Sequence, residues 1–332
     1  MKKILVLDSI PQNLISGLEA KGFQLDFKEQ VTEKDVLELP DLYYGIILRS
    51  KICIRKEIMD SKPGLKFIAR LGSGMEHIDT AYAAEKNISC LSSPEGNANS
   101  VAEHSLGLLI GCLKHIPVKD AEVRAGIWNR SKGHEIYGKT IGIIGYGNTG
   151  KAFAKLLSGF GCRILVYDIA LKGYGNERII ETDLKTLQQE ADVISFHINY
   201  TPQNHYLANA AFFNACAKNP IILNTSRGQI LSTEDLLNAL KQEEITAAGL
   251  DVLEYESASL IIPKKEDWNM NLIALSALPN VILTPHIAGQ TPEADLRHGE
   301  VILAKITSGE RRDTVPLGLD IGDNVRKEIQ TP

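Results

Sequence analysis

The sequence is poor in cysteine, and its few cysteines stand far apart. Five are present among 332 residues, an odd number, and no two of them have the spacing of a metal-binding or redox motif. They occur in apolar stretches, at Cys53, Cys90, Cys112, Cys162 and Cys216. The pattern predicts buried thiols in a reducing cytoplasm, so we expect a cytoplasmic protein without a metal centre.

Long apolar runs and blocks of like charge are also missing. No apolar run approaches the roughly 20 residues that a membrane-spanning helix needs. The apolar run at the N-terminus stops after four residues at Asp8, which favours a buried first strand over a signal peptide. The formal net charge is −5, and lysine and arginine are scattered along the chain, so nothing indicates a nucleic-acid surface. We therefore expect neither a membrane nor a nucleic acid as a partner.

The sequence contains instead an alternation of strand-like and helix-like segments, and its length predicts two domains. Short apolar runs that are typical of strands occur at residues 4–7, 45–48, 65–69, 88–91, 139–144, 162–168, 193–198, 221–224, 247–251 and 281–284. Helix-like segments include residues 14–21, 80–86, 101–115, 232–241 and 293–308. Most strands are continuous apolar runs, which suits parallel strands covered on both faces.

The helix at residues 101–115 is apolar on more of its circumference than one core face requires. We expect Asn99 or Ser100 to cap its start and Pro117 to close it. Trp128 follows soon after and could anchor a partner. This region therefore predicts a homodimer.

One glycine-rich turn gives the clearest sign of a ligand. Gly145, Gly147 and Gly150 follow an apolar strand and precede a helix-like segment. In that context the first glycine permits a tight turn, the second leaves room for a pyrophosphate, and the third lets helix and strand pack closely. Asp168 ends the next strand, eighteen residues after Gly150, at about the distance expected for a ribose-binding acid. The unit predicts a bound dinucleotide, and the acid favours NAD over NADP.

Three polar clusters follow later strands, where the ligands of open α/β sheets bind. The first contains Arg227, whose planar guanidinium can hold a carboxylate. The second offers three carboxylates, among which the sequence alone does not choose: Asp251, Glu254 and Glu256. The third contains His286, which can exchange a proton near neutral pH. The clusters together indicate an active site at one edge of a sheet.

These motifs, in this order, carry a resemblance to a known family. They lie at residues 70–79, 145–150, 224–228, 249–256 and 284–289. The chain resembles the D-isomer-specific 2-hydroxyacid dehydrogenase family over nearly its whole length, and within it the short-form D-3-phosphoglycerate dehydrogenases. The resemblance implies NAD-dependent hydride transfer between a D-2-hydroxy acid and its 2-oxo acid. The expected pair is D-3-phosphoglycerate and 3-phosphohydroxypyruvate, a step of serine biosynthesis.

The resemblance also implies a fold and its domain boundaries. We expect an α/β fold of two Rossmann-like, doubly wound parallel-sheet domains. The NAD-binding domain, residues 99–289, is inserted into a discontinuous substrate domain of residues 1–98 and 290–332. A cleft between two domains is a common place for a small ligand.

The family pattern assigns roles to residues of this chain. Arg227 would bind the substrate's carboxylate and carbonyl oxygens, His286 would be the general acid/base, and Glu256 would pair with His286. The expected cofactor-binding residues are Gly145, Gly147, Asn148, Thr149, Gly150, Asp168, His197, Thr225, Asp251 and Gly289. The expected substrate-binding residues are Arg49, Arg70, Ser73 and Gly74, with Arg130 as a further candidate for a phosphate.

Other functions remain open at this point. The same chemistry could act on glyoxylate, hydroxypyruvate or a D-lactate-type substrate, because the segment at residues 257–279 is longer than the family pattern and alters the expected cleft. A protein that senses NAD and regulates a partner is a different class of function. The presence of Arg227, Glu256 and His286 together argues against that class.

Overall fold

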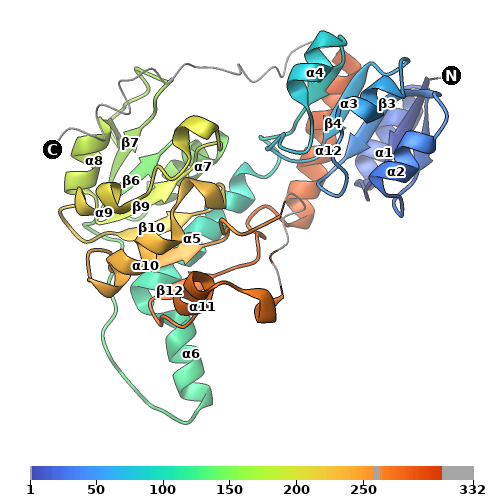
Figure 1. Cartoon of the computed structure of the whole chain (residues 1–332). Helices are drawn as coiled ribbons and strands as arrows, with labels where there is room; N and C mark the ends of the chain where they lie inside the picture. Colours follow the sequence, from blue (N-terminus) through green and yellow to red (C-terminus); the bar gives the residue numbers. More distant parts are fainter. Residues whose placement is uncertain (1, 258–261, 263, 309–332) are drawn as a thin grey trace. The chain divides into compact units, whose positions relative to one another are not determined.

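The computed structural model describes residues 2–257, 262 and 264–308 (Figure 1). Within these ranges the chain forms two compact units. The first unit contains residues 2–98, 257 and 289–308, and the second contains residues 99–256, 262 and 264–288. The tail from residue 309, and part of the long segment at residues 257–279, lie outside the described residues.

The first unit is built on a parallel sheet of five strands in the order β2-β1-β3-β4-β5. The strands are β1 (Lys2–Val6), β2 (Phe23–Phe27), β3 (Tyr43–Leu48), β4 (Phe67–Arg70) and β5 (Ser89–Leu91). Side chains of β1 alternate between two cores, with Leu5 on one face and Ile4 and Val6 on the other. The sheet is therefore covered on both faces, as continuous apolar strands predict.

Helices from both ends of the sequence cover this sheet. One core includes residues of α2 (Glu33–Glu38), α3 (Lys56–Asp60) and α4 (Thr80–Glu85). The other includes residues of α1 (Gln12–Ala20) and α12 (Pro292–Ser308). Since α12 packs against α1, the last described helix completes the first unit.

The second unit is built on a parallel sheet of seven strands in the order β12-β11-β10-β9-β6-β7-β8. The strands are β6 (Thr140–Ile144), β7 (Arg163–Tyr167), β8 (Ile179–Glu181), β9 (Val193–Phe196), β10 (Ile221–Asn224), β11 (Ala247–Leu250) and β12 (Val281–Leu283). The chain order reverses between β6 and β9. Ligands of open α/β sheets bind beyond the carboxyl ends of the strands at such a reversal.

Helices cover both faces of this sheet too. One core includes residues of α5 (Ala98–Lys114) and α7 (Asn148–Leu157). The other includes residues of α8 (Leu184–Glu190), α9 (Ala210–Asn214), α10 (Thr233–Lys241) and α11 (Met270–Ser276). α6 (Ile116–Arg124) has no buried residue and extends away from the sheet (Figure 1). Short 3-10 turns occur at Pro202–Asn204, Gly228–Ile230 and Lys265–Asp267.

The predicted fold class, two doubly wound parallel sheets, is confirmed. Two strands escaped the sequence analysis, β2 and β8. Both stand at an edge of their sheet, and none of their side chains is fully buried. An edge strand does not need the continuous apolar run by which inner parallel strands are found.

The predicted ends of the long helix are wrong. α5 begins at Ala98, so Asn99 and Ser100 lie inside its first turn rather than capping it. Pro117 does not close α5 either. His115 takes a left-handed backbone conformation, with φ of +54°, and Pro117 stands in the first turn of α6. Proline fits there because the first N–H groups of a helix have no intrahelical acceptor.

The cysteines behave as buried thiols. Burial raises the pKa of Cys90, Cys112 and Cys216 to about 12. These three side chains are buried, and Cys53 and Cys162 are partly buried. A thiol with so high a pKa stays protonated at neutral pH and is a poor nucleophile.

Candidate active site

The turn after β6 brings the backbone close to a possible phosphate position. Gly145 has φ of +97°, and a Cβ there would lie 2.5 Å from the His197 carbonyl oxygen. A Cβ on Gly150 would lie 2.1 Å from the Gly145 carbonyl oxygen, so both positions require glycine. A Cβ on Gly147 would meet no described atom within 4 Å. That side of the turn is therefore open to a ligand.

The start of α7 supplies amide donors to the same turn. Its first residues are Asn148, Thr149 and Gly150, whose N–H groups have no acceptor within the helix. The N–H of Lys151 donates to the Gly147 carbonyl at 3.0 Å and begins the helical ladder. A helix N-terminus carries partial positive charge, so this turn fits the pyrophosphate of a dinucleotide.

Asp168 follows β7 and lies beside the glycine turn. Its Oδ2 accepts a hydrogen bond from the Tyr146 N–H at 2.7 Å. Its Oδ1 accepts from the N–H groups of Ala170 and Leu171, both at 2.8 Å. These donors fix a carboxylate next to the turn, where it suits the ribose hydroxyls of NAD and repels the 2′-phosphate of NADP.

His197 follows β9, the strand across the reversal from β6. It is 7% exposed, and its ring centroid lies 5.2 Å from that of Phe153. Its Nε2 is 2.8 Å from Ser195 Oγ, and burial lowers the pKa of the ring to about 3. The ring is therefore neutral at physiological pH. His197 meets the glycine turn with its main-chain oxygen, against Gly145, and with its Cβ, against Gly150.

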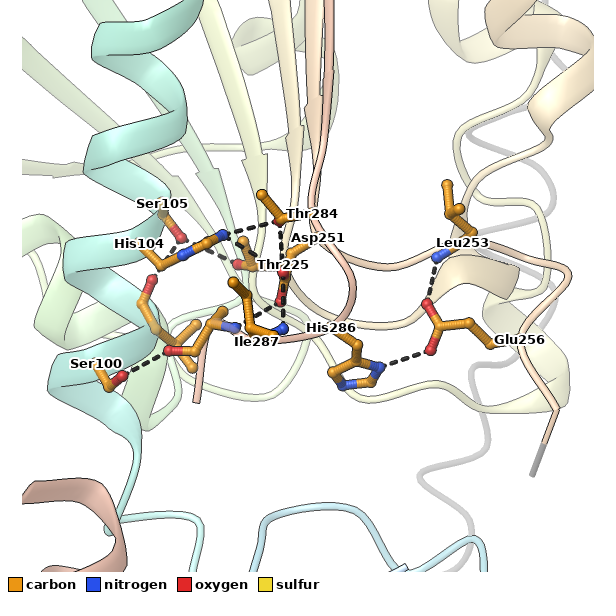
Figure 2. Close-up of polar contacts among 12 residues, drawn as sticks. Ser100, His104, Ser105, Thr225, Asp251, Leu253, Glu256, Thr284, His286 and Ile287 are labelled. Atoms are coloured by element: carbon orange, nitrogen blue, oxygen red, sulfur yellow. Dashed lines mark hydrogen bonds and ion pairs between the residues drawn. The ribbon is translucent and has the colours of Figure 1, made fainter. Parts of the chain in front are cut away.

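A histidine and a carboxylate form the most distinctive pair of this unit (Figure 2). His286 Nδ1 lies 2.6 Å from Glu256 Oε2, and Glu256 Oε1 accepts from the Leu253 N–H at 2.5 Å. The side chain of His286 is 20% exposed, and that of Glu256 is 9% exposed. His286 Nε2 makes no hydrogen bond to a residue that the structure describes, so it is available to a substrate. Of the three carboxylates that the sequence left open, Glu256 is the one paired with this histidine, not Asp251 or Glu254.

Asp251 shapes the loop after β12 that carries the histidine. Its carboxylate accepts from Thr284 Oγ1 at 2.6 Å and from the N–H groups of Ile287 and Ala288 at 2.9 Å and 2.8 Å. Burial alone would raise the pKa of Asp251, but these bonds and one from His104 outweigh it and lower the pKa. Asp251 therefore stays ionised. Both of its oxygens accept from protein donors, so the structure shows that Asp251 supports a loop. Its place near the cofactor stays a prediction.

Arg227 follows β10 on a turn that requires a glycine. A Cβ on Gly228 would lie 2.0 Å from the main-chain carbonyl carbon of Leu253, so glycine lets this turn pack against the segment after β11. Arg227 Nη1 donates to the Ser226 carbonyl at 2.7 Å. β10 and β12, which precede Arg227 and His286, both pair with β11. The guanidinium and the imidazole therefore belong to the same edge of the sheet.

The first unit carries a second glycine turn, after β4. The Gly72 N–H donates to Ser93 Oγ at 3.1 Å. Arg70 is 6% exposed and donates from Nε to the Arg49 carbonyl at 2.8 Å and from Nη1 to the Gly74 carbonyl. Within the described residues, the backbone N–H groups of Ser73 and Gly74 have no hydrogen-bond acceptor. They are available to an anion.

A buried histidine supports this turn from α12. His298 Nδ1 lies 2.7 Å from Ser93 Oγ, and a Cβ on Gly96 would lie 2.3 Å from the same nitrogen. Burial lowers the pKa of His298 to about 4, so the ring is neutral. Ser93 Oγ accepts from the Gly72 N–H and has His298 Nδ1 as a second hydrogen-bond partner. The pair fixes the turn without adding charge to it.

With both sites described, the chain can be compared with known proteins. Residues 106–288, more than half of the chain, match the family model of the D-isomer specific 2-hydroxyacid dehydrogenase, NAD binding domain. The chain belongs to this family. The family places the chain among the NAD-dependent oxidoreductases, and the residues at the glycine turn fit NAD as argued above.

Relatives of known name divide between substrates. The hydroxypyruvate reductase of Thermotoga maritima is 35% identical over 287 residues, which are 85% of this chain and 90% of the relative. The D-3-phosphoglycerate dehydrogenase of Methanocaldococcus jannaschii is 32% identical over 323 residues, which are 95% of this chain but 59% of the relative. The crystal structure of the D-lactate dehydrogenase with NAD+ from Lactobacillus jensenii has a TM-score of 0.76 at 26% identity, covering 93% of this chain and 98% of that chain.

The three arginines predicted to read a phosphate in this dehydrogenase have different surroundings. Arg49 Nη1 lies 2.9 Å from Asp295 Oδ1, and its Nε donates to the Ser9 carbonyl at 3.0 Å. Arg70 is buried in the turn of the first unit. Arg130 is an exposed residue of the second unit. Arg49 and Arg70 are therefore neighbours that already bind protein acceptors, and Arg130 stands in the other unit.

Two further residues predicted to bind the cofactor also differ in their surroundings. Thr225 Oγ1 lies 3.0 Å from Ser105 Oγ, at the carboxyl end of β10. Gly289 belongs to the first unit, where a Cβ would lie 2.7 Å from Asn97 Nδ2. Gly289 therefore lets two segments of the first unit pack closely.

Four polar side chains that support the loop after β12 and the turn after β4 have no role predicted from the sequence: His104, Thr284, Ser93 and His298. One signal was present for the first of them. Ser100 and His104 stand four residues apart on an otherwise apolar helix, so they share a face. Ser100 Oγ donates to the Ala288 carbonyl at 2.6 Å, which places that face against the loop of His286. Ser93 and His298 are far apart in sequence, and nothing local links them.

Two kinds of site are not found. Among residues 2–257, 262 and 264–308, no group of three His, Cys, Asp or Glu side chains could hold a metal ion. Within the same ranges, no helix combines the length and apolar character needed to cross a bilayer.

Proposed function

We propose that this protein interconverts a D-2-hydroxy acid and its 2-oxo acid with NAD, and that its substrate pair is D-3-phosphoglycerate and 3-phosphohydroxypyruvate. The observation that carries the reaction is the His286–Glu256 pair, at 2.6 Å, with Nε2 of the histidine left open. A carboxylate on Nδ1 orients the imidazole and stabilises its protonated form. Such a ring can give a proton to a carbonyl oxygen or take one from a hydroxyl.

The roles of the protein groups follow from this arrangement. When bound, NADH supplies the hydride that reduces the carbonyl carbon. His286 gives its Nε2 proton to the carbonyl oxygen as that oxygen gains charge, and Glu256 holds the ring in place. Arg227 binds the carboxylate and polarises the carbonyl through its guanidinium. In the oxidative direction His286 takes the hydroxyl proton instead.

The open amides of Ser73 and Gly74 are proposed to bind the substrate carboxylate. Backbone N–H groups at a glycine turn can approach an anion closely. Arg49, Arg70 and Arg130 remain the proposed readers of the substrate phosphate. Among them, Arg49 has a side chain that is 25% exposed and held by a partly exposed carboxylate, so a phosphate can compete for it.

A second candidate substrate is unphosphorylated hydroxypyruvate. The engagement of Arg70 with two main-chain carbonyls favours it, because a phosphate would have to displace those contacts. The match to the hydroxypyruvate reductase covers 90% of that relative, whereas the match to the D-3-phosphoglycerate dehydrogenase covers 59% of its relative, and this supports hydroxypyruvate too. Glyoxylate and D-lactate-type acids are smaller members of the same class.

The test is steady-state oxidation of NADH by the purified full chain with four acids: 3-phosphohydroxypyruvate, hydroxypyruvate, glyoxylate and pyruvate. The proposal expects the highest kcat/KM for 3-phosphohydroxypyruvate, and expects Arg49→Gln to lower that value more than the value for hydroxypyruvate. Arg178→Gln, an exposed arginine in the second unit, is the matched charge control. Efficient turnover of hydroxypyruvate with none of the phosphorylated acid would select the second candidate. Binding of NADH without turnover of any acid would favour an NAD-sensing protein.

We further propose a cytoplasmic homodimer, although the reason differs from the one given by the sequence. Leu108, Leu109 and Leu113 of α5 are buried in the core of their own unit, so that helix face does not need a partner. Exposed apolar side chains follow α5 in the sequence, with Val123 53% and Trp128 80% exposed. Light scattering should give twice the chain mass of 36.5 kDa, and a monomer mass would remove the proposal.

A further inference from the structure

We propose that His104 is a positioning residue for this reaction: through Thr284 and Asp251 it holds the loop that carries His286. The inference rests on the role proposed above for His286. Figure 2 shows the arrangement, with His104 on α5 facing Thr284 and Asp251, and His286 beyond them. No part of His104 needs to touch the substrate or the cofactor for this role.

The direction of the hydrogen bonds links the three side chains. Thr284 Oγ1 lies 2.6 Å from Asp251 Oδ1, and an ionised carboxylate can only accept, so the hydroxyl proton points to Asp251. The hydroxyl oxygen is then free to accept from His104 Nε2, at 2.9 Å. The same nitrogen lies 3.4 Å from Asp251 Oδ1. His104 is therefore the donor at the start of a chain that ends on a buried carboxylate.

That carboxylate sets the backbone of the catalytic loop. It accepts from the N–H groups of Ile287 and Ala288, and the main-chain oxygen of Asp251 accepts from the His286 N–H at 2.8 Å. His286 has φ of +55°, a left-handed conformation that side chains with a Cβ rarely adopt. Such a conformation persists where surrounding contacts over-determine it. The contacts around Asp251 provide that constraint.

α5 holds the loop at a second point. Ser100 Oγ donates to the Ala288 carbonyl at 2.6 Å, one turn before His104 on the same helix. The two side chains thus secure the loop at Thr284 and at Ala288, on either side of His286. A histidine that only filled space would not need its Nε2 directed at a hydroxyl already committed to a carboxylate.

The experiment compares two substitutions of His104 in the full chain. His104→Leu removes the donor, whereas His104→Gln keeps an N–H donor near the position of Nε2. Glu103→Gln, an exposed neighbour on α5, is the control for changes to the helix. Thr284→Val interrupts the same chain at its middle and serves as an independent variant. The substrate is whichever of hydroxypyruvate and 3-phosphohydroxypyruvate the unmodified protein reduces faster.

We expect His104→Leu and Thr284→Val to lower kcat by about 10-fold to 100-fold, since small displacements of a catalytic group have effects of this size. His104→Gln should restore kcat to within about threefold of the unmodified protein, and the Kd of NADH should change by less than about twofold throughout. In a His286→Ala background, His104→Leu should cause no further loss, because its effect passes through His286. An equal loss in both backgrounds would overturn the inference, as would full kcat in His104→Leu.

Hydrogen exchange gives a reading that does not depend on turnover. The amides of Ile287 and Ala288 should exchange about tenfold faster in His104→Leu, and at the original rate in His104→Gln and Glu103→Gln. Unchanged exchange in His104→Leu would show that His104 does not hold the loop. If the unmodified protein reduced none of the acids while this exchange result held, the proposed function would fail and the loop support would stand.

Discussion

The two units support their functional turns with different chemistry. In the first unit, a neutral pair, Ser93 and His298, holds the turn whose amides are proposed to bind the substrate carboxylate. In the second unit, carboxylates hold the corresponding turns by accepting hydrogen bonds from main-chain amides. Asp251 accepts from the amides of the loop after β12, and Asp168 accepts from amides beside the glycine turn after β6.

The difference between the turn after β4 and the loop after β12 follows from what each of these two segments is proposed to do. A turn that receives an anionic carboxylate gains nothing from a buried negative charge nearby, so a neutral hydroxyl and imidazole suit it better. A loop that presents an imidazole for proton transfer is compatible with carboxylates, because the Glu256 carboxylate at Nδ1 orients the ring. The first unit is therefore expected to govern substrate affinity, and the second to govern turnover and cofactor choice.

The largest effect should come from the second unit. His286→Ala removes the general acid and should lower kcat by about 10²-fold to 10⁴-fold, with a small change in the KM of the 2-oxo acid. Arg227→Ala should also lower kcat strongly, because the carbonyl loses its polarising cation. Glu256→Gln should mainly move the pH profile of kcat. Near-full activity of His286→Ala in steady-state assays would falsify the mechanism.

Cofactor choice should also follow the second unit. Asp168 is expected to give NADH a kcat/KM more than about tenfold above that of NADPH, because its carboxylate repels a 2′-phosphate. Asp168→Ser should lower the ratio of kcat/KM for NADH to kcat/KM for NADPH, because NADH binds more weakly and NADPH is no longer repelled. Asp183→Ser, which replaces a helix cap in the same unit, controls for loss of a carboxylate. Equal efficiency of the two cofactors with the unmodified protein would remove Asp168 from this role.

A smaller effect is expected from the first unit. His298→Leu removes a hydrogen-bond partner of the Ser93 hydroxyl, and the KM of the 2-oxo acid should rise by about tenfold with little change in kcat. His298→Asn should keep KM near its original value, because the asparagine amide, which can both accept and donate, can take the place of Nδ1. A fall in kcat at constant KM would contradict the proposal that the first unit governs substrate affinity and the second unit governs turnover.

The sequence predicted the second unit in more detail than the first, and the reason is physical. Gly145, Gly150 and Asp168 act through a turn and a strand end that are close in sequence, so their spacing reveals them. Ser93 and His298 meet only because α12 packs into the first unit, and no local pattern encodes that contact. Spacing also could not show that Arg70 would be buried against main-chain carbonyls.

The dependence on tertiary contacts also explains why the argument from the long helix to a dimer changed. Its apolar circumference predicted a dimer contact, but two faces of a helix can be buried within one chain. α5 packs its leucines into the core and turns its polar residues, Ser100 and His104, toward the strand ends. The sequence shows how much of a helix is apolar, and only the packed structure shows what covers it.

The smallest expected effect concerns stability. It tests whether His298 is a neutral support, in contrast to the carboxylates of Asp251 and Asp168. Burial lowers the pKa of His298 to about 4, whereas an unfolded histidine titrates near 6.5. Between these values the unfolded chain binds more protons than the folded one, so stability falls as pH drops from 6.5 toward 4. The contribution of His298 is fully present above pH 6.5, and its loss should cost on the order of 1–3 kcal/mol.

Urea unfolding at pH 7 and at pH 5 measures this loss. His197 has a pKa lowered in the same direction and contributes to the same window, so the comparison is made between the unmodified protein and His298→Asn. Asparagine keeps a hydrogen-bond partner for Ser93 but does not titrate, and the variant should lose less stability between the two pH values. If both proteins lost the same amount, His298 would not be the neutral support that distinguishes the first unit from the second.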